Sequence, residues 1–271
     1  MSEVEGFILS EIPYGDTSKI INIFTKNGVI GCIAKGAKTL KSNLRVNTTK
    51  FTYGKFVINE KKDKLSLLTE ASSINELINI KNDLLLISYL SYIVELTNQV
   101  IKQTDDYESL YNLFINLILK MNNNLNPKVL TNIYELKVLD YLGVGINFNS
   151  CNICGSTKNI ITIDGDIGGY VCSNCYTNET IYDNKTIKML RMYYLIDIST
   201  ISELKISNNV INNIDRFINI YYDRYTGLYL SSKKFLESID KMYWRVHFFF
   251  HQTTRTHTSW YEFLCYDNIK M

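Results

Sequence analysis

The spacing of apolar residues divides the chain into a first part with strand-like segments and a second part with helical ones. In the first 71 residues, short runs rich in Ile, Val, Phe and Thr alternate with turn signals, which is typical of β-strands. The five runs are 6–12, 19–25, 29–37, 51–59 and 64–71. Five short strands in this length favour a small closed barrel of the OB type, with an SH3-like barrel as the alternative.

From about residue 80 the apolar positions recur at the three- and four-residue spacing of helices. Pro127 suits the first turn of the third predicted helix, and the glycines at 143 and 145 favour its end. The predicted helices are 83–103, 107–121, 127–142, 186–196, 208–225 and 232–241. The pattern therefore predicts an α+β multidomain protein, with an OB-type barrel at 1–78, an all-helical domain at 79–241 and an atypical aromatic tail at 242–271.

The tail holds both tryptophans and all three histidines of the chain. His247 and His251 are four residues apart, a spacing that can place two imidazoles on one metal, but no carboxylate or third histidine is positioned to complete a site. Packing of an aromatic segment on the helical domain, or disorder, is the favoured interpretation of the tail.

Four of the six cysteines form two Cys-x-x-Cys pairs, Cys151 with Cys154 and Cys172 with Cys175, separated by residues 155–171. Two thiolates on a tight turn can reach one metal, and a second such turn completes a tetrahedron of sulfur ligands. Residues 159–164 and 168–171 look like two short strands joined by a Gly-rich turn. The spacing predicts a zinc ribbon at 148–178 holding one structural Zn²⁺, with four buried thiols or two disulfides as the alternative.

Composition bears on the choice between metal and disulfides. The 271 residues are 46% hydrophobic and 21% charged, which is enough to bury a core, and no apolar run of 18 or more residues suggests a membrane span. The N-terminus carries early acids and lacks the basic and apolar regions of a secretory signal. A cytoplasmic location is expected, where thiols stay reduced, and this favours metal binding.

Charge is distributed unevenly along the chain. The net charge is only +2, yet residues 17–59 contain eight basic residues and no Asp or Glu. The densest part should be an exposed loop that turns at Gly36, and such a loop can follow a phosphate backbone. We therefore predict nucleic-acid binding, rather than a merely solvated face, and its candidate contacts are Lys35, Lys38, Lys41 and Arg45.

Three aromatic residues, Phe51, Tyr53 and Phe56, follow this loop. Aromatic side chains of an OB-type barrel can stack on bases, but alternation in a strand fits core packing better. No Walker-type phosphate loop or paired carboxylate motif is present, and the glycines of 165–169 fit the ribbon's turn. The sequence predicts a binding protein rather than an enzyme.

The segment EIPYGDTSKIINIFTKNGVIGCIAKGAKTLKSNL, residues 11–44, resembles the N-terminal signature of the RecO family of bacterial DNA repair and recombination mediators. The shared features are the Tyr-x-Asp-x-Ser/Thr start, the IFT run with its Gly-containing turn, and the small residues leading into Lys-Gly and Lys-Ser. The ribbon, CNICG…CSNC, is a second match that many members carry. The resemblance covers about residues 5–240.

The resemblance implies a non-enzymatic protein that binds single- and double-stranded DNA and anneals complementary strands. It also implies a RecR-like partner, the acidic C-terminal tail of the single-strand binding protein SSB, and indirectly RecA, in a bacterial cytoplasm near the nucleoid. By position, the four basic loop residues would contact DNA phosphates and the four cysteines would hold zinc. An RNA-binding or ribosome-associated factor, and a zinc-stabilised interaction module without nucleic acid, are the alternatives that the residues themselves leave open.

Overall fold

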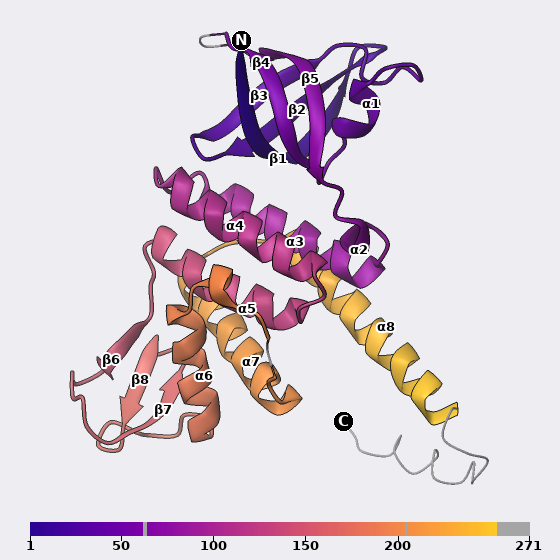
Figure 1. Cartoon of the computed structure of the whole chain (residues 1–271). Helices are drawn as coiled ribbons and strands as arrows, with labels where there is room; N and C mark the ends of the chain where they lie inside the picture. The colour runs from indigo at the N-terminus through magenta and orange to yellow at the C-terminus, as the bar shows by residue number, and fades with distance from the viewer. Residues whose placement is uncertain (62–63, 204, 254–271) are drawn as a thin grey trace.

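A computed structural model describes the backbone of residues 1–61, 64–203 and 205–253, and the side chains up to residue 242. A five-stranded barrel stands on a layer of helices, and a small three-stranded sheet lies at the side of the helical part (Figure 1). The two tryptophans, the three histidines and Cys265 of the predicted tail lie outside the residues whose side chains are described.

The barrel closes in the strand order β1-β2-β3-β5-β4. β3 and β5 pair in parallel and the other neighbours are antiparallel, which confirms the OB-type barrel and decides against the SH3-like one. A short helix, α1 (Leu44–Asn47), connects β3 to β4. The strands are β1 (Ser2–Tyr14), β2 (Ser18–Thr25), β3 (Gly28–Ala34), β4 (Tyr53–Asn59) and β5 (Ser66–Asn75).

The helical part follows the predicted periodicity closely. Asp83, Asp106 and Asn126 each cap a helix by accepting hydrogen bonds from backbone N–H groups of its first turn. The helices are α2 (Ile78–Lys81), α3 (Leu84–Val100), α4 (Tyr107–Asn122), α5 (Pro127–Tyr141), α6 (Asn184–Leu195), α7 (Asn208–Tyr225) and α8 (Ser231–Thr253), with a 3₁₀ turn at Ile198–Thr200. α8 continues beyond the predicted end at residue 241, because the chain has no Gly or Pro after Gly227 to stop it.

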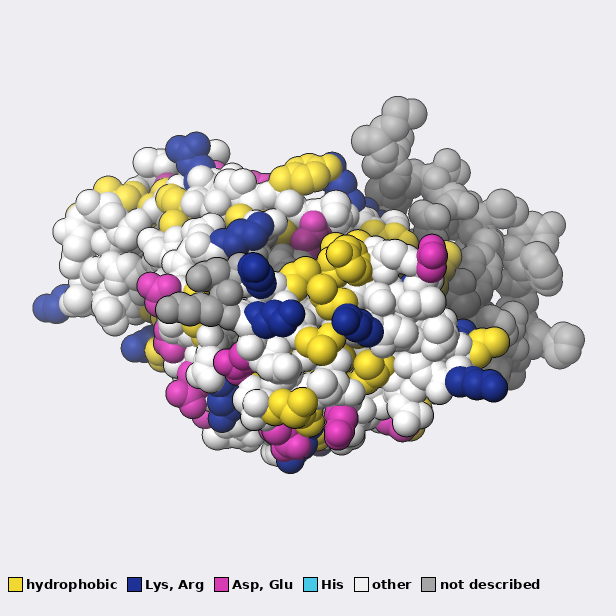
Figure 2. Space-filling model, turned by 90° about the horizontal axis from the view of Figure 1, so that it is seen from above, with side chains coloured by type: hydrophobic (Ala, Val, Ile, Leu, Met, Phe, Trp, Pro, Cys, Tyr) yellow, Lys and Arg dark blue, Asp and Glu magenta, His cyan; other side chains and the backbone are white. Residues whose placement is uncertain are grey.

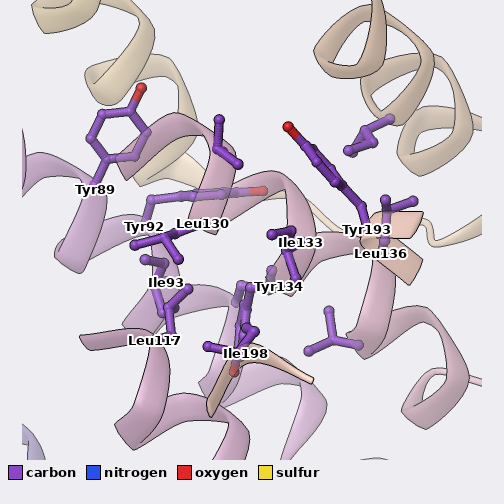
Figure 3. Close-up of a cluster of buried hydrophobic side chains, with 14 of the residues drawn as sticks. Tyr89, Tyr92, Ile93, Leu117, Leu130, Ile133, Tyr134, Leu136, Tyr193 and Ile198 are labelled. Carbon is purple, nitrogen blue, oxygen red and sulfur yellow. The ribbon is translucent and has the colours of Figure 1, made fainter. Parts of the chain in front are cut away.

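The core of the helical part is built around α5, most of whose side chains are buried. Figure 3 shows Ile133, Tyr134 and Leu136 of this helix among side chains from neighbouring elements, including Tyr92 of α3 and Tyr193 of α6. The Tyr134 hydroxyl lies 2.6 Å from the Thr97 hydroxyl, which satisfies both buried polar groups.

One wall of the barrel shares this core with the helices. The ring of Phe114 in α4 packs edge-on against Phe7 of β1 and Phe24 of β2, at centroid distances of 5.0 and 5.8 Å. Glu5 accepts hydrogen bonds from the hydroxyls of Tyr53 in the barrel and Tyr111 in α4, at 2.7 and 3.3 Å. The barrel is therefore joined to the helices by a continuous apolar contact.

α8 is fastened to the bundle at its first residues. The Glu95 carboxylate of α3 accepts hydrogen bonds from the backbone N–H groups of Ser231 and Ser232, at 3.1 and 2.8 Å. The Lys233 ammonium lies 3.2 Å from the carboxylate of Glu135, whose side chain is almost fully buried in α5 and also accepts from the Tyr92 hydroxyl. Burial raises the pKa of Glu135, and the nearby Lys233 charge opposes that shift.

The small sheet lies between α5 and α6 in the chain, and it has the order β6-β8-β7. The sequence predicted β7 (Ile160–Asp164) and β8 (Gly169–Cys172) but not β6 (Asn147–Cys151). Phe148 of β6 attaches the sheet to the helices, because its ring packs 5.6 Å from Tyr170 and 5.1 Å from Tyr194 of α6. Among the described residues, no helix is both long and apolar enough to cross a membrane.

Candidate metal centre and nucleic-acid interface

The two Cys-x-x-Cys pairs meet at one point of the small sheet. The Sγ atoms of Cys151, Cys154, Cys172 and Cys175 all lie within 4.8 Å of one another, and Cys154 and Cys172 are 3.6 Å apart. Sulfur ligands about 2.3 Å from a tetrahedral zinc stand nearly 4 Å apart. The four sulfur atoms therefore have the spacing that a single metal ion needs.

Backbone turns hold each pair in place. The Gly155 N–H donates to the Cys151 carbonyl at 2.9 Å, and Gly155 has φ +74°, a conformation that a side chain would strain. In the second pair, the Cys175 N–H donates to the Cys172 carbonyl at 3.1 Å. Cys151 and Cys172 are buried, whereas Cys154 is exposed, so the cluster lies at the edge of the ribbon.

The electrostatics of the cluster favour a cation. Burial alone would raise the pKa of Cys151, but backbone N–H groups of Cys154, Cys172 and Ile153 donate to its sulfur and lower the pKa to about 6. The pKa of Cys175 is raised to about 12, first because it shares a hydrogen bond with Cys154 and also because of burial. The backbone N–H groups around Cys151 thus favour its thiolate, and a metal ion bound by the four sulfur atoms would stabilise their negative charge.

The predicted basic loop lies at the rim of the barrel. Gly36 has φ +69° at its turn, and the Lys38 N–H donates to the Thr17 carbonyl at 2.8 Å. The Lys38 ammonium also donates to the Gly15 carbonyl at 3.2 Å. The loop is therefore pinned to the turn between β1 and β2, and it is less free than its composition indicated.

One expectation about this segment needs correction, because Arg45 is part of the helix α1 rather than of an extended loop. Three other basic residues of the run 17–59, Lys19, Lys26 and Lys55, form ion pairs with glutamates from outside the run.

The four candidate contacts differ from these paired lysines. Lys35, Lys38, Lys41 and Arg45 are exposed, and none of them forms an ion pair within the part of the chain that the structure describes. The candidates are thus positive charges that remain available to a ligand.

The aromatic residues after the loop belong to the core. Phe51 packs against Phe7, Tyr53 donates to Glu5, and Phe56 is fully buried inside the barrel. The structure therefore confirms core packing for these three residues, and none of them is available to stack on a base.

Comparison with known proteins assigns the barrel with the basic loop and the helical part with the four cysteines to one family. A family model described as "Recombination protein O N terminal" matches residues 1–77, and one described as "Recombination protein O C terminal" matches residues 81–234. The chain belongs to the RecO family. The first match covers the barrel with its basic loop, and the second covers the helices with the four cysteines.

Curated relatives agree over most of the chain. A DNA repair protein RecO from Bacillus velezensis is 29% identical over 246 residues, which are 89% of this chain and 96% of the relative. The DNA repair protein RecO of Halalkalibacterium halodurans is 31% identical over 244 residues, with the same coverage of both chains. A Listeria monocytogenes relative of the same name is 29% identical over 245 residues. The chain is therefore a DNA repair protein of the RecO family.

Proposed function

We propose that this chain binds single- and double-stranded DNA without sequence preference, anneals complementary strands and, with a RecR-like partner, helps to load RecA onto SSB-coated DNA. The observation that carries the proposal is a set of four exposed positive side chains without an ion pair among the described residues. Lys35, Lys38 and Lys41 lie on the loop pinned to the barrel rim, and Arg45 lies on the short helix α1 that follows it. The roles of RecR, SSB and RecA follow from the family resemblance.

The charge arrangement suits annealing. Two DNA backbones repel each other, and a cationic surface that neutralises phosphates lowers this repulsion for any sequence. Phosphates are the same in both strand forms, so a phosphate-binding loop accepts single strands and duplexes. The proposed activity requires binding and bringing strands together, and we propose that the chain performs it without catalysing a covalent step.

We further propose that the four-cysteine cluster holds one structural Zn²⁺. The four protein sulfur atoms would close the coordination sphere, which leaves no open position for a substrate and fits a structural ion. The ion would link the turn after β6 to the turn after β8. We also propose that residues 1–78 and 79–241 are the two functional units, with DNA on the first, the RecR-like and SSB partners on the second, and the protein near the nucleoid.

The test of DNA binding uses residues that do not hold the loop together. Because Lys38 also bonds to Gly15, the better double variant is Lys35→Gln with Lys41→Gln. Each lost phosphate contact should reduce the slope of log affinity against log salt by about 0.9 on duplex DNA and about 0.7 on single strands. Lys185→Gln with Lys188→Gln, two exposed lysines of α6, is the matched control.

The measurement is fluorescence anisotropy on single-stranded and duplex DNA of two unrelated sequences, followed by strand annealing on SSB-coated DNA. We expect the loop variant to lose slope equally on both sequences and to anneal more slowly, while the control keeps the parental values. A loop variant with the parental slope would show that the loop is only a solvated surface. Tighter binding to structured RNA than to DNA would favour the RNA-binding alternative instead.

A further inference from the structure

The outer face of the barrel carries a row of apolar side chains at the end away from α4. Ile12 of β1 pairs with Ile20 of β2, Ile20 pairs with Ile33 of β3, and Ile33 pairs with Leu67 of β5. Directly paired residues lie on the same face of a sheet, so the four side chains form one line across four strands. At about 4.8 Å per strand, the line spans roughly 14 Å.

The four side chains of this line face away from the inside of the barrel. Its sequence neighbours Ile21, Cys32 and Leu68 fill the inside of the barrel, and side chains alternate along a strand. Ile12 is 54% exposed, and Ile20, Ile33 and Leu67 are half-buried. Single exposed apolar residues are ordinary, but a contiguous set across four strands is typical of a surface that binds a ligand or a partner.

Two more side chains extend the row. Leu65, which is 38% exposed, lies over Gly31 of β3, since a Cβ at Gly31 would come within 2.8 Å of the Leu65 side chain. Tyr14 lies two residues beyond Ile12 on the same face of β1 and is 51% exposed. We call the set of Ile12, Tyr14, Ile20, Ile33, Leu65 and Leu67 the outer apolar row.

Positive charges lie at both ends of the outer apolar row. Tyr14 pairs with Ser18, whose hydroxyl accepts from the Gly36 N–H at 3.4 Å, so the basic loop begins beside the tyrosine. At the other end, Lys61 and Lys64 are exposed in the connection that leads to Leu65. Seen from above the orientation of Figure 1, the molecule shows Lys and Arg side chains interspersed with hydrophobic ones (Figure 2).

We propose that the bases of single-stranded DNA lie on the outer apolar row, with Tyr14 as the side chain on which a base stacks. This inference rests on the proposed DNA binding and adds to it a contact that distinguishes the two strand forms. An unpaired strand can place its bases against aromatic and apolar side chains and its phosphates against the cations that flank them. The bases of a duplex are stacked on each other, so they cannot reach Tyr14, and duplex DNA uses the basic loop alone.

The experiment compares strands with and without bases. Anisotropy at fixed salt is measured with an oligo-dT strand, with an abasic strand of the same length and with a duplex. The parent should bind oligo-dT roughly tenfold more tightly than the abasic strand, as expected for stacking of one base. Tyr14→Ala should remove most of this preference and leave the abasic and duplex affinities and the salt slope unchanged.

Three further variants keep the result interpretable. Tyr14→Phe should retain the preference, because it keeps the ring, and Ile12→Ala should weaken it about twofold to threefold by removing a smaller apolar contact. Tyr229→Ala is the matched control, since Tyr229 is 73% exposed in the connection between α7 and α8. Circular dichroism establishes that each variant is folded.

The outcomes separate this inference from the proposed function. A parent that binds oligo-dT and the abasic strand equally would overturn the base contact and leave loop-mediated DNA binding standing. A parent that binds no DNA would overturn both. An equal loss of affinity for all three ligands in Tyr14→Ala would also refute the inference. Binding of oligo-dT to the helical domain rather than to the barrel would refute it as well. Competition by an acidic apolar peptide without any effect of base removal would assign the row to a protein partner instead.

Discussion

Replacing Lys233 with methionine tests how α8 is held on the helical bundle. Methionine keeps the length and apolar character of the lysine stem and removes its charge. The lysine ammonium lies 3.2 Å from the Glu135 carboxylate and above the rings of Tyr92 and Tyr222, at 5.5 and 5.3 Å from their centroids. The substitution therefore removes the counter-charge of a carboxylate that is 3% exposed, while the surrounding packing is retained.

The magnitude follows from this burial. Removing one partner of a fully buried ion pair costs about 3–5 kcal/mol, because the other charge is left uncompensated. Here the lysine side chain is 22% exposed and the Tyr92 hydroxyl still donates to Glu135, which places the expected loss near 2–3 kcal/mol. For a chain of this size the loss corresponds to a fall in melting temperature of about 4–12 °C.

The sign of the pH dependence is a second, independent check. Burial raises the pKa of Glu135 in the folded protein, and loss of Lys233 removes the main effect that opposes the rise. A carboxyl whose folded pKa is raised destabilises the fold above that pKa and ceases to do so once it is protonated. The cost of Lys233→Met should therefore be larger at pH 8 than at pH 5.

The assay is urea unfolding followed by far-UV circular dichroism at both pH values. Lys234→Met is the matched control, since Lys234 is the exposed neighbour in α8. In a Glu135→Gln background, Lys233→Met should lose most of its effect, because no buried charge is left to compensate. Equal losses for Lys233 and Lys234, or a loss independent of both pH and Glu135, would refute the electrostatic account of this contact.

Two further predictions concern the metal centre and the cap of α8. Protein purified under reducing conditions should carry one zinc ion per chain by elemental analysis, and Cys172→Ser should release it and loosen residues 147–178 in hydrogen exchange; metal-free parent protein would contradict this. Burial raises the pKa of Glu95, but hydrogen bonds from Ser232 and Ser231 outweigh it and hold the pKa below the usual range of a glutamate. The stabilising cap should thus be fully present above the ordinary glutamate pKa and be lost as pH falls through the lower pKa of the folded protein, so the stability difference between parent and Glu95→Gln should shrink as pH falls, and a constant difference would disprove the role of the charge.

The sequence was sufficient where a local signal sets the structure. Pro127 at the first turn of α5 and Gly143 after its end marked that helix correctly, because both residues act through their own backbone conformation. The geometry of the two Cys-x-x-Cys turns is likewise set by their own local backbone. The spacing therefore predicted a cluster that the fold brings together, although the chain between the pairs also had to form two strands.

Contacts between distant segments could not be predicted in the same way. The charge run 17–59 gave no sign that Glu3 would pair with Lys55 or Glu108 with Lys26, because those partners come from a neighbouring strand and from α4. Glu135 has the sequence context of an ordinary polar position of a helix, and its burial is explained by partners from other helices, the Lys233 ammonium of α8 and the Tyr92 hydroxyl of α3. These pairs depend on tertiary packing, which the local pattern does not encode.

A β-bulge in β1 explains why the outer apolar row escaped the sequence pattern. The register of β1 against β2 shifts between Ile8 and Ser10, so one extra residue enters the strand at that point. Before the bulge, odd positions such as Phe7 face outward onto α4; after it, Ile12 and Tyr14 face outward instead. A regular strand would turn both side chains into the barrel, because a shift of one residue exchanges the two faces.

The bulge thus gives the outer face of one strand two different partners. Its first half is buried against Phe114, which fixes the barrel on the helices, and its second half is left open beside the basic loop. A rigid mounting matters for the proposed annealing, since a phosphate-binding loop on a tethered, freely turning barrel would not hold one strand in a defined place relative to a partner bound on the helices. The same β-strand that anchors the barrel therefore also carries Tyr14, which we propose contacts a DNA strand bound by the loop.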